Sequence, residues 1–211
     1  MVVVANRPVF RTQRAGQQGI ALILVLIMLS AIFLMTAFGA RMTLSSEKAT
    51  RNDRDRQIAF QAAEAALGDA EIDIMGPNTA SNSREAVMDS RNLQLFAQDC
   101  GATAESRGLC HTNISTISQF YKSVNFEDTS ASRRYVTLGE YTGRGSGFST
   151  GDSALPARLP RYIVETIPYN IPGGCPNQKA FLITTLGYGM NPQTQVMLQS
   201  VIFKPSAILK C

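Results

Sequence analysis

The chain has 211 residues, 45% of them hydrophobic, and a formal net charge of +4. The 19 residues at the amino end include Arg7, Arg11 and Arg14 and no acidic residue, which leaves 17 Lys and Arg against 16 Asp and Glu elsewhere. The basic balance therefore comes from one end of the chain and does not indicate a nucleic-acid-binding domain. Beyond the apolar segment described next, the length leaves room for one modest folded domain.

An uncharged apolar segment follows the basic end. Ile20 to Ala40 comprises 21 residues without a charge. A helix of that length extends about 32 Å, which is enough to cross the hydrocarbon core of a bilayer. The preceding arginines predict that the amino end stays in the cytoplasm. A secretory signal peptide has a shorter apolar stretch and a cleavage site after it, so this segment is predicted to remain on the protein as a membrane helix.

A glycine lies directly in front of this helix. The segment Arg14-Ala15-Gly16-Gln17-Gln18-Gly19 resembles the leader of a type IV prepilin, whose dedicated peptidase cuts after such a glycine at the cytoplasmic face. The resemblance implies cleavage between Gly19 and Ile20, with N-methylation of Ile20 and residues 1–19 as the removed leader. The alternative is a single-pass anchor that holds an unrelated periplasmic domain.

Helical character continues beyond the membrane segment. Residues 45–75 are rich in Ala, Glu, Arg, Gln and Leu and contain no Pro. Apolar residues recur at spacings of three and four residues and form one stripe along the predicted helix. The stripe comprises Phe60, Ala63, Leu67, Ala70 and Ile74. The residues predicted on the opposite face are Arg54, Asp55, Gln61 and Asp69. We therefore predict one helix over residues 20–75, with its striped face covering a sheet.

The remaining residues, 76–211, are predicted to form an α+β head domain. Helical periodicity is moderate over Ser83 to Ala97, and Ile114 to Val124 is a candidate for a second short helix. The glycine-rich stretch 139–151 lacks the Gly-Lys-Ser/Thr ending of a phosphate-binding loop, so we interpret it as a flexible loop.

Strand signals dominate the last third of the chain. The candidate strands are Arg134 to Leu138, Arg161 to Ile167, Ala180 to Tyr188 and Thr194 to Phe203. Gly187 to Pro192 is typical of a hairpin turn between the last two strands. The sequence thus predicts a long helix packed on an antiparallel sheet of about four strands.

The chain has four cysteines, Cys100, Cys110, Cys175 and Cys211. If the amino end is cytoplasmic, all four face an oxidising compartment, where cysteines normally pair. Four cysteines allow three connectivities, and the sequence alone does not choose among them. We favour the pairs Cys100–Cys110 and Cys175–Cys211, because each closes a short segment within one region. A zinc site is disfavoured, since there is no CxxC pair and His111 is the only histidine.

Two segments resemble the PilX-type minor pilins. Residues 47–56 (EKATRNDRDR) and 59–67 (AFQAAEAAL) are similar to the amino-terminal signature of that family. Residues 160–165 (PRYIVE), 181–189 (FLITTLGYG) and 194–200 (TQVMLQS) resemble its closing hairpin. The resemblance implies a type IV pilin-like fold and a structural component that primes pilus assembly at or near the filament tip, supporting adhesion and twitching motility.

The same resemblance implies partners and a location. The implied partners are other minor pilins, the major pilin, a PilY-type tip adhesin and the prepilin peptidase. Before assembly the chain would span the inner membrane once with a periplasmic head, and afterwards it would belong to the pilus at the cell surface. Major pilins carry a glutamate as fifth residue of the mature chain, where this chain has Leu24. A tip subunit, with nothing above it, would not need that carboxylate; alternatively, its loss merely weakens packing.

Competing functions follow from the same residues. One is a tip pseudopilin of a type II secretion system, and another is a membrane-anchored periplasmic enzyme. No G-x-S-x-G or H-E-x-x-H motif surrounds the single histidine, so we expect no catalytic residue, cofactor or metal ligand. Binding of DNA would depend on scattered arginines, which are more typical of a solvated surface and make a nucleic-acid partner unlikely. Those arginines are Arg133, Arg134, Arg144, Arg158 and Arg161.

Overall fold

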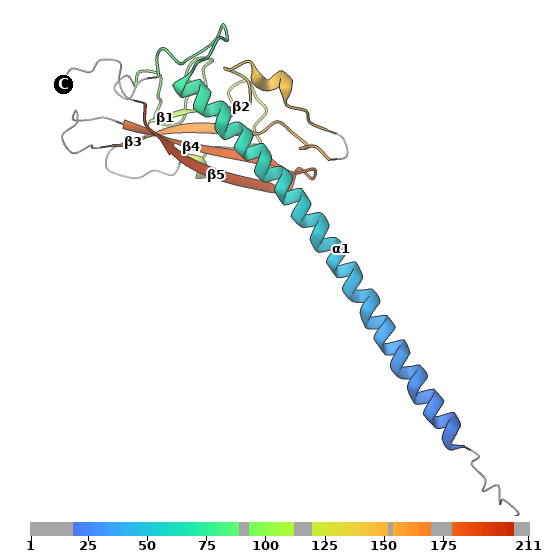
Figure 1. Ribbon diagram of the computed structural model, residues 1–211. Coiled ribbons are helices and arrows are strands. Elements are labelled where there is room, and N and C mark those ends of the chain that lie inside the picture. The colour runs from blue at the N-terminus through green and yellow to red at the C-terminus, as the bar shows by residue number, and fades with distance from the viewer. Residues whose placement is uncertain (1–18, 89–92, 112–119, 152–153, 170–178, 205–211) are drawn as a thin grey trace, which may run out of the picture. The chain divides into compact units, whose positions relative to one another are not determined.

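The computed structural model describes residues 19–88, 93–111, 120–151, 154–169 and 179–204. Figure 1 shows the order of the elements along the chain. The elements are α1 (Ile20–Met75), β1 (Leu109–His111), the 3-10 turn η1 (Phe120–Lys122), β2 (Val136–Thr137), the 3-10 turn η2 (Arg144–Gly147), β3 (Arg161–Pro168), β4 (Lys179–Tyr188) and β5 (Gln195–Ile202). The chain divides into two compact units, Met1–Thr50 and Arg51–Cys211, and each is described by itself.

The described part of the first unit is helical after Gly19, and its side chains are exposed throughout. This part of α1 is long and apolar enough to cross a membrane by length and composition. Its hydroxyl groups do not compete with the helix. Ser30, Thr36 and Thr43 each donate a hydrogen bond of 2.8–3.0 Å to a backbone carbonyl three or four residues earlier. These three hydroxyl groups are therefore satisfied without water.

The second unit contains a mixed sheet. Its strand order is β1-β3-β4-β5, and β2 also pairs with β3. The pairs β2–β3, β3–β4 and β4–β5 are antiparallel, whereas β1 runs parallel to β3, with Leu109 opposite Val164. The prediction of an α+β fold with a long helix on a sheet is confirmed.

The long strands β3, β4 and β5 and the hairpin between the last two agree with the sequence prediction. The candidate strand Arg134–Leu138 shrinks to Val136–Thr137. The expectation of a purely antiparallel sheet is wrong, because the sequence analysis did not predict β1. Three residues are too few to show a periodicity of two, and β1 exists only because its backbone meets that of β3.

The moderate helical periodicity over Ser83–Ala97 does not lead to a continuous helix in the described part of that range. Residues 84–88 make one turn, closed by the Met88 amide and the Arg84 carbonyl at 3.1 Å, and the described residues from 93 onward form further turns. The hydrophobic core takes up Met88 and Phe96 individually, which replaces a continuous helical face. Of the candidate helix Ile114–Val124, residues 114–119 lie outside the described residues and the rest contains η1.

The core lies on both faces of the sheet. On one face the second half of α1 packs against Tyr162, Val164, Phe181 and Ile183. The apolar residues that α1 buries are Ala59, Ala62, Ala63, Ala66, Ala70 and Ile74. On the other face, segments from residues 100–135 cover a second cluster, which comprises Cys100, Cys110, Val124, Phe126, Tyr135, Ile163, Leu186 and Tyr188.

The predicted helical stripe is therefore partly wrong. Ala63, Ala70 and Ile74 are buried as expected, but Phe60 is 43% exposed and Leu67 is only half-buried. The sheet selects the alanine side of the helix because the two backbones approach closely. A Cβ atom on Gly187 of β4 would overlap the backbone of Ala59 and Ala63. Small residues on both sides are the condition for this contact.

We expect opposite effects from two glycine-to-alanine changes in this unit. Gly187→Ala should lower the free energy of unfolding by about 1–3 kcal/mol, because neither backbone can move away from the added methyl group. Gly68→Ala in α1 has open space around it and should raise that free energy by about 0.5–1 kcal/mol. Urea unfolding of the detergent-solubilised chain, followed by its tyrosine fluorescence, measures both. Equal shifts in the same direction would contradict the close contact.

Candidate functional site

The predicted cleavage site lies at the beginning of α1. Gly19 has φ +123°, a backbone conformation that L side chains rarely adopt, and Ile20 is the first helical residue. Residues 1–18, including the predicted basic leader, are outside the described residues. A residue with a side chain at position 19 would be strained in this conformation, so the local geometry itself favours glycine there.

The membrane segment presents an apolar surface that no other described residue covers. Leu24, at the position where major pilins carry glutamate, is 52% exposed, and Phe33 is 73% exposed. Exposed apolar surface of this extent is unfavourable in water, so lipid tails or the apolar helices of partner subunits must cover it. The apolar part of α1 is the first candidate functional surface.

The second half of α1 carries three buried carboxylates that hold different parts of the head. Asp55 accepts a hydrogen bond of 3.2 Å from the Asn191 amide in the β4–β5 turn. Asp69 accepts one of 2.7 Å from the Gly139 amide and another from the Thr142 hydroxyl. The sequence prediction placed Asp55 and Asp69 on the exposed face, which is wrong. Each meets donors from a loop far away in the sequence, and sequence periodicity cannot reveal such a partner.

The third carboxylate, Asp73, forms a buried ion pair with Arg84. Their side chains are 0% and 4% exposed, and the Tyr162 hydroxyl donates to the same carboxylate at 3.0 Å. Burial alone would lower the pKa of Arg84, but the adjacent Asp73 carboxylate raises it above its usual value. Burial, followed by the charge of Asp73, raises the pKa of Tyr162 well above its ordinary value. Arg84 is therefore charged, and Tyr162 is neutral, across the physiological pH range.

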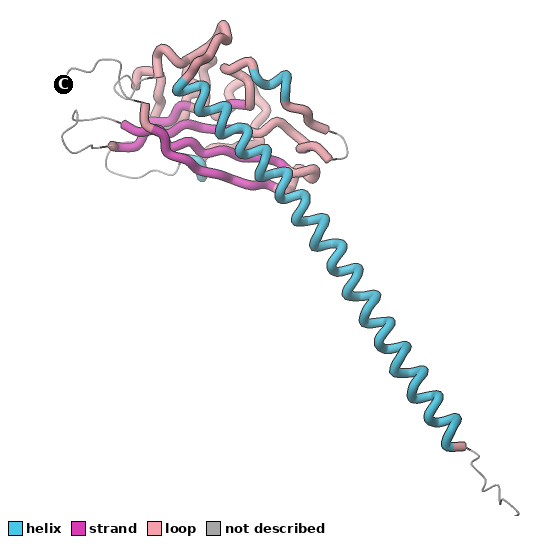
Figure 2. The backbone as a smooth tube through the Cα atoms, viewed as in Figure 1, coloured by secondary structure: helices cyan, strands magenta, loops and turns pink. Residues whose placement is uncertain are grey.

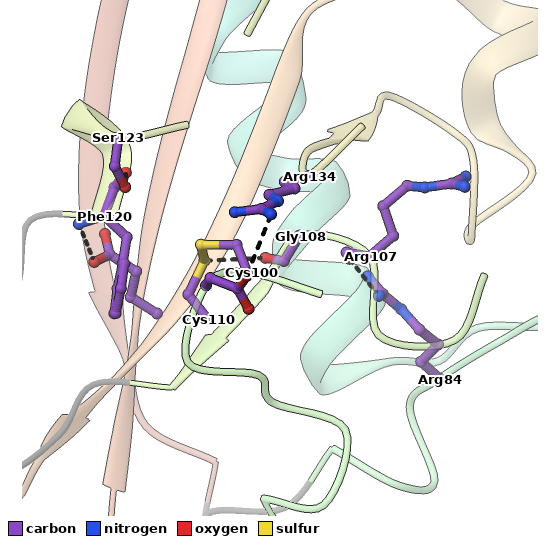
Figure 3. The surroundings of a disulfide bond; sticks show 10 residues. Arg84, Cys100, Arg107, Gly108, Cys110, Phe120, Ser123 and Arg134 are labelled. Carbon is purple, nitrogen blue, oxygen red and sulfur yellow. Dashed lines mark hydrogen bonds and ion pairs between the residues drawn. A yellow bond between two sulfur atoms is a disulfide. The ribbon is translucent and has the colours of Figure 1, made fainter. Parts of the chain in front are cut away.

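Arg84 also connects α1 to the disulfide loop, which comprises residues 100–110. Its Nη1 group donates to the carbonyl oxygens of Glu105 (3.3 Å) and Arg107 (2.8 Å). Its guanidinium lies 3.6 Å from the centre of the Tyr141 ring. Figure 3 shows Arg84 directed at the backbone of Arg107. Sequence reasoning missed Arg84, since no local pattern indicates that Asp73 and the carbonyl groups of Glu105 and Arg107 surround it.

A disulfide between Cys100 and Cys110 closes this loop, as Figure 3 shows. This pairing is one half of the connectivity that the sequence analysis favours. The other proposed pair, Cys175 and Cys211, lies outside the described residues. Backbone hydrogen bonds reinforce the closure, since the Gly108 amide donates to the Gly101 carbonyl at 3.1 Å. The disulfide loop is thus held at both ends, and it leads directly into β1.

The arginines considered for nucleic-acid binding have partners within the head. Arg133 contacts Glu140 at 3.0 Å and Arg134 contacts Asp99 at 3.2 Å. Arg158 pairs with Glu127. Arg161 is 7% exposed and lies 4.5 Å from the Tyr135 ring and 5.3 Å from the Tyr188 ring. Of the five, only Arg144 has neither an ion pair nor a ring contact among the described residues. It lines a recess together with Asp69 and Phe148. These contacts organise the head.

The described residues contain no group of three or more His, Cys, Asp and Glu side chains placed to hold a metal ion. His111 lies at the end of β1, with its Nδ1 atom 3.4 Å from the Thr166 hydroxyl. Glu165 is fully buried, and burial raises its pKa, although the Phe120 amide donates to it at 3.0 Å and acts in the opposite direction. Its observed role is to attach η1 to the sheet.

Comparison with protein families gives two matches. The family model described as PilX N-terminal matches residues 18–67. The model described as type IV pilus assembly protein PilX C-term matches residues 98–204, about half of the chain. Neither the curated proteins nor the solved structures contain a significant match.

We expect Arg84→Met to lower the free energy of unfolding by about 3–5 kcal/mol, because it leaves the Asp73 carboxylate buried without a counter-charge. Adding Asp73→Leu to this variant should recover part of the loss, since no buried charge remains. The exposed pair Arg134–Asp99 provides the control, and Arg134→Met should cost at most about 1 kcal/mol. Urea unfolding compares the three variants. Similar losses for Arg84→Met and Arg134→Met would refute the special role of the buried pair.

Proposed function

The chain belongs to the PilX family of type IV pilus assembly proteins, and we propose that it acts as a minor pilin that primes pilus assembly at or near the filament tip. The family is a structural component of the pilus, and the long helix on a mixed sheet is consistent with a pilin-like fold. The proposed role is accordingly structural and involves no catalysis.

The observation that carries this proposal is the exposed apolar part of α1. No side chain of the other described residues covers this segment. Lipid covers such a helix before assembly, and neighbouring apolar helices cover it in a filament, so the same surface serves both states. Membrane anchoring and a pilus location follow from the family together with this helix.

We place the head in the periplasm before assembly. The basic residues Arg7, Arg11 and Arg14 precede the membrane segment, which favours a cytoplasmic amino end. The disulfide between Cys100 and Cys110 supports the same topology, because such bonds persist in oxidising compartments. The prepilin peptidase would meet Gly19 at the cytoplasmic face of the membrane.

The proposed tip position rests on Leu24. In a major pilin the glutamate at this place is thought to pair with the free amino terminus of a neighbouring subunit, since a carboxylate in an apolar layer needs a cation. A subunit with an amino terminus but no carboxylate can receive a partner from below and cannot dock beneath one above. It would therefore begin filaments, in contact with the other minor pilins, the major pilin and a PilY-type adhesin.

Processing of the leader can be tested at one residue. Gly19→Phe should leave a full-length membrane protein that does not support piliation, because the peptidase site accepts only hydrogen at that position. Gly16→Phe, in the same leader, is the matched control and should be processed. Mass spectrometry of the filament-associated protein should find a methylated Ile20 at the amino terminus. Detection of Met1 in that protein would overturn the processing proposal.

Deletion of the gene should reduce the number of surface pili much more than their length, because initiation fails and elongation does not. Electron microscopy of negatively stained cells measures both quantities. Leu24→Glu should be tolerated, or it should increase the share of the protein found along the shaft. Immunogold labelling of the native chain should mark filament ends. Even labelling along the shaft would contradict the tip position while leaving the family role intact.

A further inference from the structure

The two edges of the sheet differ. One edge is formed by β1 and β2, which are three and two residues long and pair with different parts of β3. The other edge is β5, which pairs with β4 over all eight of its residues. Among the described residues no strand lies on the outer side of β5 (Figure 2). The sheet therefore has one interrupted edge and one long continuous edge.

The features that normally protect an edge strand are missing from β5. No charged residue occurs from Met190 to Phe203, and Pro192 precedes the strand. The register with β4 is continuous from Gln195 to Ile202, so no bulge turns the edge away. Edge strands usually carry a lysine, a proline or a bulge that prevents another chain from pairing with them. An unprotected edge of this length is a template for one more strand.

The hairpin shows which backbone groups are available. The Gly189 amide donates to the Thr194 carbonyl at 2.8 Å, so these two residues form a hydrogen-bonded pair at the end of the ladder. Hydrogen-bonded and non-bonded pairs alternate along antiparallel strands. With the observed register, the residues that direct their N–H and C=O groups away from β4 are Gln195, Met197, Gln199 and Val201. Four residues thus direct backbone groups to the outer edge, where no described strand pairs with them.

The surroundings of this edge are partly apolar. Met197 is 40% exposed and Val201 is 54% exposed. A groove of about 500 Å³ lies between β5 and α1. Phe60, itself 43% exposed, lines it together with the polar residues Asp53, Arg56 and Gln57. An added strand would place alternate side chains against the outer sheet face and into this groove. The edge therefore fits an extended peptide that carries apolar side chains beside polar ones.

We propose that the β5 edge pairs with a β-strand of another type IV pilus subunit, which continues the sheet across the subunit boundary. The inference rests on the proposed function, because only assembly into a filament tip keeps such a subunit beside this edge at high effective concentration. The free backbone groups supply affinity, whereas the apolar side chains and the groove select the partner strand. Pairing between two copies of this chain is an alternative occupant that the test separates.

Photo-crosslinking in piliated cells tests the edge directly. The full-length chain carries p-benzoylphenylalanine at Met197, and the control carries it at the exposed Thr103, in the disulfide loop next to the opposite edge. Irradiation should give a defined adduct from position 197 whose partner peptides identify a type IV pilus subunit. Adducts from position 103 alone, adducts with a second copy of this chain, or adducts with proteins outside the pilus would each overturn the proposal.

A lysine at the edge gives the second measurement. Val201→Lys should reduce the adduct from position 197 at least about tenfold, since pairing would bury an uncompensated charge. It should leave the melting temperature unchanged, because the side chain is exposed in the isolated chain. Thr103→Lys is the matched control and should leave the adduct unaltered. The two claims fail in different ways. If deletion of the gene reduces the number of pili but the Val201→Lys variant retains the full adduct, only the inference about the β5 edge fails. If deletion leaves the number of pili unchanged, the proposed function fails.

Discussion

The head depends on the close contact between the alanine face of α1 and strand β4. Gly187 allows the strand backbone to approach Ala59 and Ala63, and no larger residue fits at that point. This contact fixes which face of the helix is buried and leaves Phe60 at the surface. It also determines which face of the sheet remains for the loops of residues 100–135. Packing of small residues, more than the size of the apolar side chains, therefore sets the architecture.

Polar contacts then connect the irregular segments to this framework. Asp55, Asp69 and Asp73 lie on the buried face of α1, and each binds a different part of the head. Beside the apolar side chains that the loops bury, hydrogen bonds and the ion pair with Arg84 define the positions of the loops. The disulfide between Cys100 and Cys110 serves the same purpose for one of these loops. A head that carries irregular connections can in this way present defined surfaces to other subunits.

The two units of the chain expose different kinds of surface. The apolar half of α1 has no protein cover among the described residues and requires lipid or partner helices. The outer edge of β5 pairs with no strand among the described residues and offers its backbone groups to a partner. A subunit of the PilX family that passes from membrane to filament can use both surfaces, because neither of them is needed to stabilise the isolated head.

The sequence by itself determined the membrane helix, its continuation to Met75, the three long strands and the hairpin, because periodicity over many residues is a local property. Only the tertiary structure decided that β1 joins the sheet, that Asp55 and Asp69 are buried, and that Arg84 pairs with Asp73. Such choices depend on residues far apart along the chain; the partners Asp73 and Tyr162 are separated by 89 positions. A local pattern cannot indicate which distant donor will meet a carboxylate, since that depends on how closely the two backbones pack.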